Sequence, residues 1–279
     1  MVIVSPEEPG HPLEPRLRAL QAAGWDASLA RRPPRIRRPD VVHLNAPEPP
    51  VDADVIHVES DALRALAIRR GAPPERVFTI APVPVAARPP GPPDGVLRLY
   101  SPVPPTWADG PEDALVAVRR LVDRGIAVEF RLPPSGPFLD AVEFARHQLG
   151  LEREVIFESD PHGDVLVSAA VSPRSPRSAL DAMAAGLPVV QTEELGPAVV
   201  VPPRDPDALA VALAGLAADM ARRRRLAEEG VRFAAGFTAE RQVRLYVELY
   251  SAAASVASAA RSSTVHSSAS DETRASSSS

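Results

Sequence analysis

The chain has 279 residues, no cysteine, and 36 acidic side chains against 31 basic ones, which gives a formal net charge of -5. Disulfides and thiolate metal sites are therefore excluded. Every basic residue is an arginine, so mechanisms that require a lysine amine are excluded as well. A mildly acidic chain is a poor nonspecific binder of nucleic acid, and we expect no nucleic-acid partner. Hydrophobic residues make up 45% of the chain, enough for a buried core in one or two domains.

The amino-terminal part alternates short apolar runs with helical segments, which is typical of a parallel α/β sheet. Ser60 is a good N-cap and Gly71 a helix-ending glycine for one of these helices. We expect strands at residues 2–4, 41–44, 55–58 and 77–80, and helices at 15–23 and 61–70. The dense prolines that follow predict a stiff linker. Residues 1–82 are therefore predicted to form a reduced α/β domain, and residues 83–95 a proline-rich linker.

After the linker the same alternation continues, and it predicts a second, larger α/β domain over residues 96–236. We expect its strands at 97–100, 127–132, 155–158, 165–171, 188–192 and 198–201, and its first helices at 111–124, 137–149 and 176–185. No proline follows Pro206, and Asp205 is a suitable N-cap, so the rest is expected to be helical. Further helices are predicted at 222–230 and 238–254, the latter within a C-terminal helix segment of residues 237–255. The serine-rich residues 256–279 are predicted to be a disordered tail.

One segment, residues 172–192, has features of a phosphate site. Ser175 is expected to cap a helix that begins with Pro176, and Arg174 and Arg177 flank that helix start. Unpaired N–H groups at a helix start, together with arginines, bind phosphate, and after a parallel strand they lie at the ligand-binding edge of the sheet. The alternative is that these arginines are ordinary solvated surface residues.

The run ALDAMAAGLPVV at residues 179–190 resembles the donor-binding signature of retaining glycosyltransferases with the GT-B architecture, the family 4 group. The similarity extends in chain order over residues 114–158, 199–219 and 222–250. In the first half, residues 54–82 resemble the last elements of that family's amino-terminal domain.

This resemblance implies two Rossmann-like domains that face each other across a cleft, the first of them shortened here. It implies retaining transfer of a hexosyl group from a nucleotide-diphosphate sugar, held mainly by the second domain, to an unidentified acceptor on the first. The donor-binding residues are then expected to be Arg174, Ser175, Arg177, Ser178, Asp181, Thr192, Glu194 and Gly196. Asp181 is expected to accept hydrogen bonds from the ribose of the donor, or else to face solvent. No metal site and no cofactor besides the donor substrate are expected.

Two departures from the family pattern leave alternatives open. Pro173 stands where the family has the first of its two glutamates, and residues 101–112 hold neither the arginine nor the lysine that normally stabilise the leaving diphosphate. We expect Arg174 and Arg177 to replace those cations in part. The first alternative is a noncatalytic homologue that binds a nucleotide sugar or serves as the partner subunit of an active transferase. The second is the product of a decaying gene that folds only in part.

Other residues carry weaker signals. His11 and His43 lie near expected strand ends and are acceptor-side candidates, although a lone histidine in such a place, His57 included, is more often structural. The arginine run 222–225 is usually a solvated face, and the alternative is peripheral contact with anionic lipid or a lipid-linked acceptor. We expect a cytoplasmic protein, because the start MVIVSPEEPG lacks signal-peptide features and no apolar run could span a membrane. The composition indicates a GC-rich bacterial genome.

Overall fold

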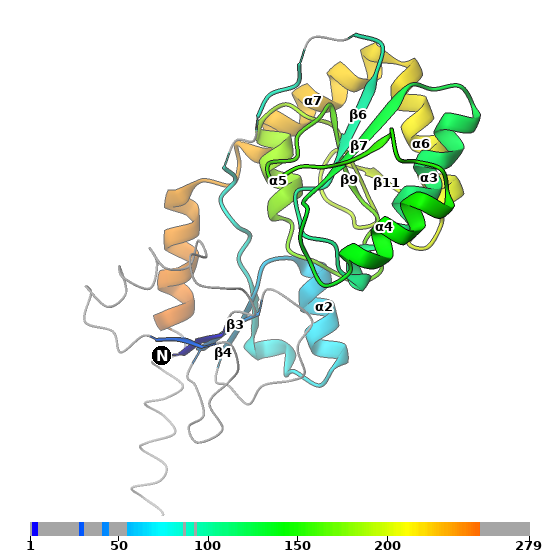
Figure 1. The fold of residues 1–279 in the computed structure, drawn as a ribbon. Coiled ribbons are helices and arrows are strands. Elements are labelled where there is room, and N and C mark those ends of the chain that lie inside the picture. The colour runs from blue at the N-terminus through cyan, green and yellow to red at the C-terminus, as the bar shows by residue number, and fades with distance from the viewer. Residues whose placement is uncertain are drawn as a thin grey trace, which may run out of the picture. The chain divides into compact units, whose positions relative to one another are not determined.

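The structure is a computed structural model that describes residues 2–4, 28–30, 41–44, 55–85, 88–91 and 94–251. The chain divides into two compact units (Figure 1). The first comprises Met1–Ala81 together with Ala239–Ser279, and the second comprises Pro82–Thr238. The prediction of an α/β chain is confirmed, because both units contain parallel sheets connected by helices.

The first unit contains two small parallel sheets. One pairs β1 (Val2–Val4) with β2 (Ser28–Ala30), and the other orders β3 (Val41–Leu44), β4 (Val55–Val58) and β5 (Val77–Thr79) side by side. The sequence predicted every one of these strands except β2. Helix α2 (Asp61–Arg69) follows β4 and begins as expected, since the Ser60 hydroxyl accepts a hydrogen bond from the Leu63 N–H at 3.1 Å. A short 3-10 turn, η1 (Pro74–Arg76), leads into β5. The predicted helix at 15–23 and the serine-rich tail lie outside the described residues.

A helix at residues 239–251 returns to this first unit. Leu249 is buried against Val55 and Ile80, and the Gln242 side-chain amide donates to the carbonyl of Ala81 at 2.9 Å. This helix therefore supplies part of the core of the first unit.

The second unit is built on one six-stranded, fully parallel sheet. In spatial order its strands are β11 (Val199–Val200), β10 (Val189–Gln191), β9 (Val165–Ser168), β6 (Leu97–Tyr100), β7 (Val128–Leu132) and β8 (Val155–Phe157). All six strands were predicted, although several are shorter than expected. The buried apolar runs explain why they form strands at the centre of the sheet: Val165, Leu166 and Val167 are almost inaccessible to solvent.

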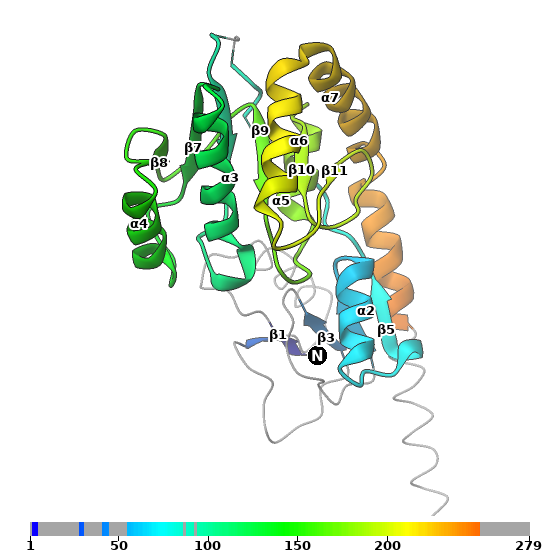
Figure 2. The ribbon, with the colours of Figure 1, turned by 90° about the vertical axis from the view of Figure 1, so that its right-hand side faces the viewer.

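Helices cover both faces of this sheet (Figures 1 and 2). One layer contains α3 (Pro111–Asp123), α4 (Leu139–Gln148) and α6 (Pro206–Ala218), and the other contains α5 (Arg177–Ala184) and α7 (Met220–Ala234). A 3-10 turn, η2 (Trp107–Asp109), precedes α3. The first layer buries leucines against the sheet, and the second packs closely through alanines, as at Ala182 and Ala234.

Several helices start at other residues than expected: α4 begins at Leu139 instead of residue 137, and α7 and α5 differ for reasons that the structure shows. Helix α7 begins earlier than predicted because the Asp219 carboxylate accepts a hydrogen bond from the Arg222 N–H at 2.8 Å and acts as its N-cap. The prediction that Ser175 caps α5 is wrong: the N-cap residue is Pro176, and the helix begins at Arg177. The Ser175 hydroxyl instead accepts a hydrogen bond from the Arg177 N–H, at 3.3 Å. This bond spans only two residues, so it closes a tight turn that leads into the first residue of the helix.

Candidate functional site

The strand order of the second unit reverses between β6 and β9. From β6 the chain proceeds to β7 and β8 on one side, and from β9 it proceeds to β10 and β11 on the other. In open α/β sheets, ligands bind at such a switch point, in the crevice beyond the carboxyl ends of the strands. The loops after β6, β9 and β10 therefore form the candidate functional site.

The loops after β6 and β9 are fastened to each other. Gly110 has a φ of 60°, and a Cβ atom at this position would lie 2.1 Å from the carbonyl oxygen of Ala169. The Val171 N–H donates to the Ala108 carbonyl at 2.9 Å. Only glycine tolerates both the left-handed backbone and the close approach. This junction fixes the distance between the two loops at the switch point.

Arg174 is held at this junction by two carboxylates. Its guanidinium lies 2.8 Å from Asp109 Oδ1, and its backbone N–H donates to Glu193 Oε1 at 2.7 Å. The Asp109 carboxylate also accepts a hydrogen bond from the Thr106 N–H at 3.0 Å, which orients it. Residues of all three loops thus converge on Arg174.

Glu193 is an acidic group in a partly desolvated position. Burial raises the pKa of its carboxyl, while the hydrogen bond from the Arg174 N–H and the charge of Arg174 act in the opposite direction. A carboxylate on a backbone N–H is a chemical stand-in for a phosphate oxygen. The protein itself therefore occupies one anion-binding position of the expected site.

Asp181 lies on α5 and is already hydrogen bonded. Its Oδ1 accepts from the Val85 N–H of the proline-rich segment at 2.7 Å. Burial raises its pKa, opposed by the Val85 hydrogen bond and by the charge of Arg177. The oxygen expected to face a ribose thus has a partner within the chain.

The remaining donor-site candidates lie in the loops after β9 and β10. Ser175, Arg177 and Ser178 lie where the loop after β9 enters α5, and Thr192 is tied to that loop because its hydroxyl donates to the Ala170 carbonyl at 2.7 Å. Gly196 lies beside α7, because a Cβ atom there would lie 2.8 Å from the Phe233 ring. Glu194, in the loop after β10, is exposed.

The acceptor-side candidates belong to the first unit. His11 lies outside the described residues. His43 is in β3, in register with His57 of β4. The ring of His57 is buried, lies within hydrogen-bonding distance (2.9 Å) of the Ile80 carbonyl, and contacts the Tyr246 ring edge-on. His57 therefore has a structural role, as expected for a lone histidine at the end of a strand.

Three residues that the sequence analysis did not single out contribute to the site: Asp109, Glu193 and Tyr100. Asp109 had a local signal, since Thr106 and Asp109 have the spacing of a reciprocal cap. Tyr100 ends β6 with 3% of its surface exposed, and in the described part of the chain its hydroxyl has no hydrogen-bond partner. Burial, and secondarily the charge of Asp181, raise the pKa of Tyr100.

The described residues offer no group of three or more His, Cys, Asp or Glu side chains that could hold a metal ion. Within the same residues, no helix is long and apolar enough to cross a membrane.

Comparison with known proteins identifies the fold. No protein-family model and no curated protein matches the sequence. Among solved structures, the Anabaena protein HepE, crystallised with UDP and glucose, matches with a TM-score of 0.61 at 16% identity, over 76% of this chain and 71% of HepE.

Two further structures agree with it. The sucrose-phosphate synthase of Thermosynechococcus elongatus matches with a TM-score of 0.61 at 21% identity, over 72% of this chain and 59% of its own. A glycosyltransferase of Rickettsia africae ESF-5 matches with a TM-score of 0.61 at 12% identity, over 88% of this chain and 83% of its own. The chain thus spans less than two thirds of the synthase. The GT-B fold expected from the sequence is confirmed.

Proposed function

We propose that this protein is a glycosyltransferase that takes its sugar from a nucleotide-diphosphate donor bound at the switch point of the second unit. The observation that carries the proposal is the meeting of three loops beyond the carboxyl ends of β6, β9 and β10, around Arg174. Support comes from the shared fold, and HepE, which has that fold, was crystallised with UDP-glucose.

In the proposed chemistry, positively charged groups of the protein face the diphosphate as it leaves the sugar. When the sugar leaves its donor, negative charge grows on the diphosphate, and preorganised donors that face this charge lower the barrier. Arg174, Arg177 and the N–H groups of the first turn of α5 are the groups proposed for this role. Binding of the diphosphate then requires that Glu193 yield the Arg174 N–H. The family 4 assignment, the retaining outcome, hexosyl transfer, an acceptor on the first unit and a cytoplasmic location are part of the same proposal.

A second function is favoured by a specific observation. Arg174 is neutralised by Asp109, and its N–H is taken by Glu193, so the charges that would stabilise a leaving diphosphate are satisfied internally. A noncatalytic protein that binds a nucleotide sugar, or a partner subunit of an active transferase, would have this arrangement without penalty.

Calorimetry with UDP-glucose, together with an assay for released UDP, tests both functions. Turnover supports the transferase, and saturable binding without turnover over a panel of acceptors supports the noncatalytic protein. The double variant Arg174→Ala with Arg177→Ala is expected to weaken binding by at least about 100-fold, because each hydrogen bond to a charged group contributes about 1.5–3 kcal/mol and 1.4 kcal/mol corresponds to about a factor of ten. The control is Arg119→Ala, which removes an arginine that pairs with Asp123 on α3, away from the three loops of the site. Unchanged affinity in the double variant would remove the basis of the proposal.

A further inference from the structure

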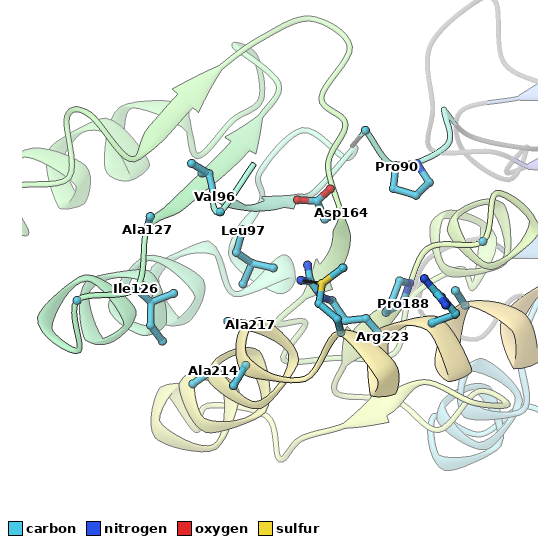
Figure 3. A pocket seen from close by; sticks show the side chains of 18 residues that line it. Pro90, Val96, Leu97, Ile126, Ala127, Asp164, Pro188, Ala214, Ala217 and Arg223 are labelled. Atoms are coloured by element: carbon cyan, nitrogen blue, oxygen red, sulfur yellow. Dashed lines mark hydrogen bonds between the residues drawn. The ribbon is translucent and has the colours of Figure 1, made fainter. Parts of the chain in front are cut away.

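A cavity lies at the amino ends of the strands of the same sheet, opposite the switch point (Figure 3). It has a volume of about 830 Å³ and is lined where strands begin: by Leu97 of β6, Ala127 before β7, Asp164 before β9 and Pro188 before β10. Cavities of roughly 300–1,000 Å³ hold small molecules in proteins. Because the amino ends of parallel strands face away from the switch point, this cavity is distinct from the candidate functional site.

The walls of the cavity are aliphatic. Leu97 and Ile126 contribute from the sheet side, and Ala214 and Ala217 contribute from α6 (Figure 3). The small alanine side chains leave space between α6 and the edge of the sheet. None of the described lining residues is aromatic, so the cavity offers no surface on which a nucleotide base could stack. These walls suit a saturated chain.

A cationic group lies among these walls. Figure 3 shows Arg223 of α7 beside the cavity, on the side from which α7 packs. Its Nη2 contacts the Met220 sulfur, and its Nε is buried with no hydrogen-bond partner in the described part of the chain. No carboxylate among the described residues forms an ion pair with it. A thioether is a weak acceptor, so the terminal nitrogens of this guanidinium have unused capacity for an anion.

The other charged groups at the cavity do not prevent Arg223 from binding an anion. Arg224 also lines it and adds a second positive charge. The Asp164 carboxylate is engaged elsewhere, since its Oδ2 accepts a hydrogen bond from the Arg98 N–H at 2.9 Å. The cavity therefore combines apolar walls with a net positive charge.

We propose that this cavity binds a single-chain anionic amphiphile, an alkyl carboxylate whose chain lies against Leu97, Ile126 and the alanines of α6 and whose head group pairs with Arg223. A compact anion such as free phosphate would leave the aliphatic walls uncovered, and a neutral chain would leave Arg223 unmatched. The proposal does not depend on the glycosyltransferase function, because it uses none of the residues at the switch point.

The test is calorimetry of the full chain with dodecanoate below its micelle concentration, with acetate and dodecanol as partial analogues. We expect saturable 1:1 binding of dodecanoate and none of acetate. Arg223→Gln is expected to weaken dodecanoate at least about tenfold, the effect of losing a charged hydrogen-bond partner, and to leave dodecanol unchanged. Arg232→Gln, an exposed arginine of the same helix outside the cavity, is the matched control.

A second measurement locates the ligand. The chain has only three methionines, and Met220 lines the cavity while Met183 is buried in the core. In methyl NMR spectra, dodecanoate should shift the Met220 signal and leave the Met183 signal in place. Ala217→Trp, which fills the cavity, should abolish both binding and shift while the melting temperature reports whether the variant folds. Equal affinity for Arg223→Gln, equal affinity for acetate, or an unshifted Met220 signal would each overturn the proposal.

Discussion

Glu193 is the residue whose removal tests the reasoning about the switch point most directly. Its carboxylate accepts the Arg174 N–H at 2.7 Å, so a phosphate oxygen can use that donor only after the carboxylate has left. Hydrogen bonds that involve a charged group contribute about 1.5–3 kcal/mol. Glu193→Ala removes this competitor and is expected to tighten nucleotide-sugar binding by about 10- to 150-fold, since each 1.4 kcal/mol corresponds to about a factor of ten.

The assay is calorimetry of wild type and variant with UDP-glucose, and with inorganic pyrophosphate as a probe that is independent of the base. Glu143→Ala is the matched control, because it removes the same charge from an exposed position on α4. Glu193→Gln separates charge from occupancy: it keeps a neutral acceptor in place and should give a smaller gain than Glu193→Ala. Affinity for both probes that is unchanged or weaker in Glu193→Ala would refute the competition.

The same residue predicts a pH dependence. Burial raises the pKa of Glu193 above its unfolded value, so the folded state favours the protonated carboxyl. Stability attributable to this group is therefore present at low pH and is lost as pH rises from about 4.5 through the raised folded value. Nucleotide affinity should likewise increase as pH falls through this range, because a protonated carboxyl competes less for the Arg174 N–H. In Glu193→Ala, this part of both pH profiles should disappear.

Three further variants test the structure around the site, each by denaturant unfolding. Gly110→Ala should lower the free energy of unfolding by at least about 2 kcal/mol, because its Cβ would meet the Ala169 carbonyl. Gly150→Ala, with a similar φ of 61° and open space around it, should lower it by only about 1 kcal/mol. Equal losses in the two variants would contradict the close approach at Gly110. Tyr100→Phe removes a hydroxyl that is buried without a described partner and should leave stability unchanged or raise it by about 1 kcal/mol, and a loss would reveal an unrecognised partner. Asp205→Ala should cost about 1 kcal/mol because its carboxylate caps α6 through the Ala208 N–H at 2.8 Å, and no loss would mean that water replaces the cap.

Most strands of the second unit could be predicted because they are short runs whose apolar residues are buried. The ends of the strands could not. The run at residues 165–171 was predicted as one strand, but β9 ends at Ser168, and Val171 instead donates to the Ala108 carbonyl in a neighbouring loop. Apolar residues that pack against another loop look the same in the sequence as apolar residues in a sheet. Strand β2, only three residues long and ending in alanine, gave too little apolar signal.

The candidate site was predictable only in part, for a similar reason. The arginines next to α5 were found because they adjoin a helix start and a strand. Their partners were not found, because Asp109 and Glu193 come from the loops after other strands and meet Arg174 only through the strand order. That order depends on which side of the sheet each crossover takes, which a single sequence does not state. Ser175 was misjudged as a cap because Pro176, the residue after it, takes the N-cap position itself.

The arginines at the two ends of the parallel strands differ in their partners, and this difference affects how tightly each site should bind an anion. At the switch point, Arg174 has Asp109 on its guanidinium and Glu193 on its N–H, so a diphosphate that binds Arg174 has to displace these protein anions. An exchange of anion for anion yields little net free energy, because the new contacts replace old ones of the same kind. At the other edge, Arg223 has only a thioether as a described partner, so an incoming carboxylate forms its contact without displacing another. For anions of equal charge, the cavity beside Arg223, which has no described carboxylate partner, should therefore bind more tightly than the switch point in the wild-type chain. Glu193→Ala should reduce this difference in affinity.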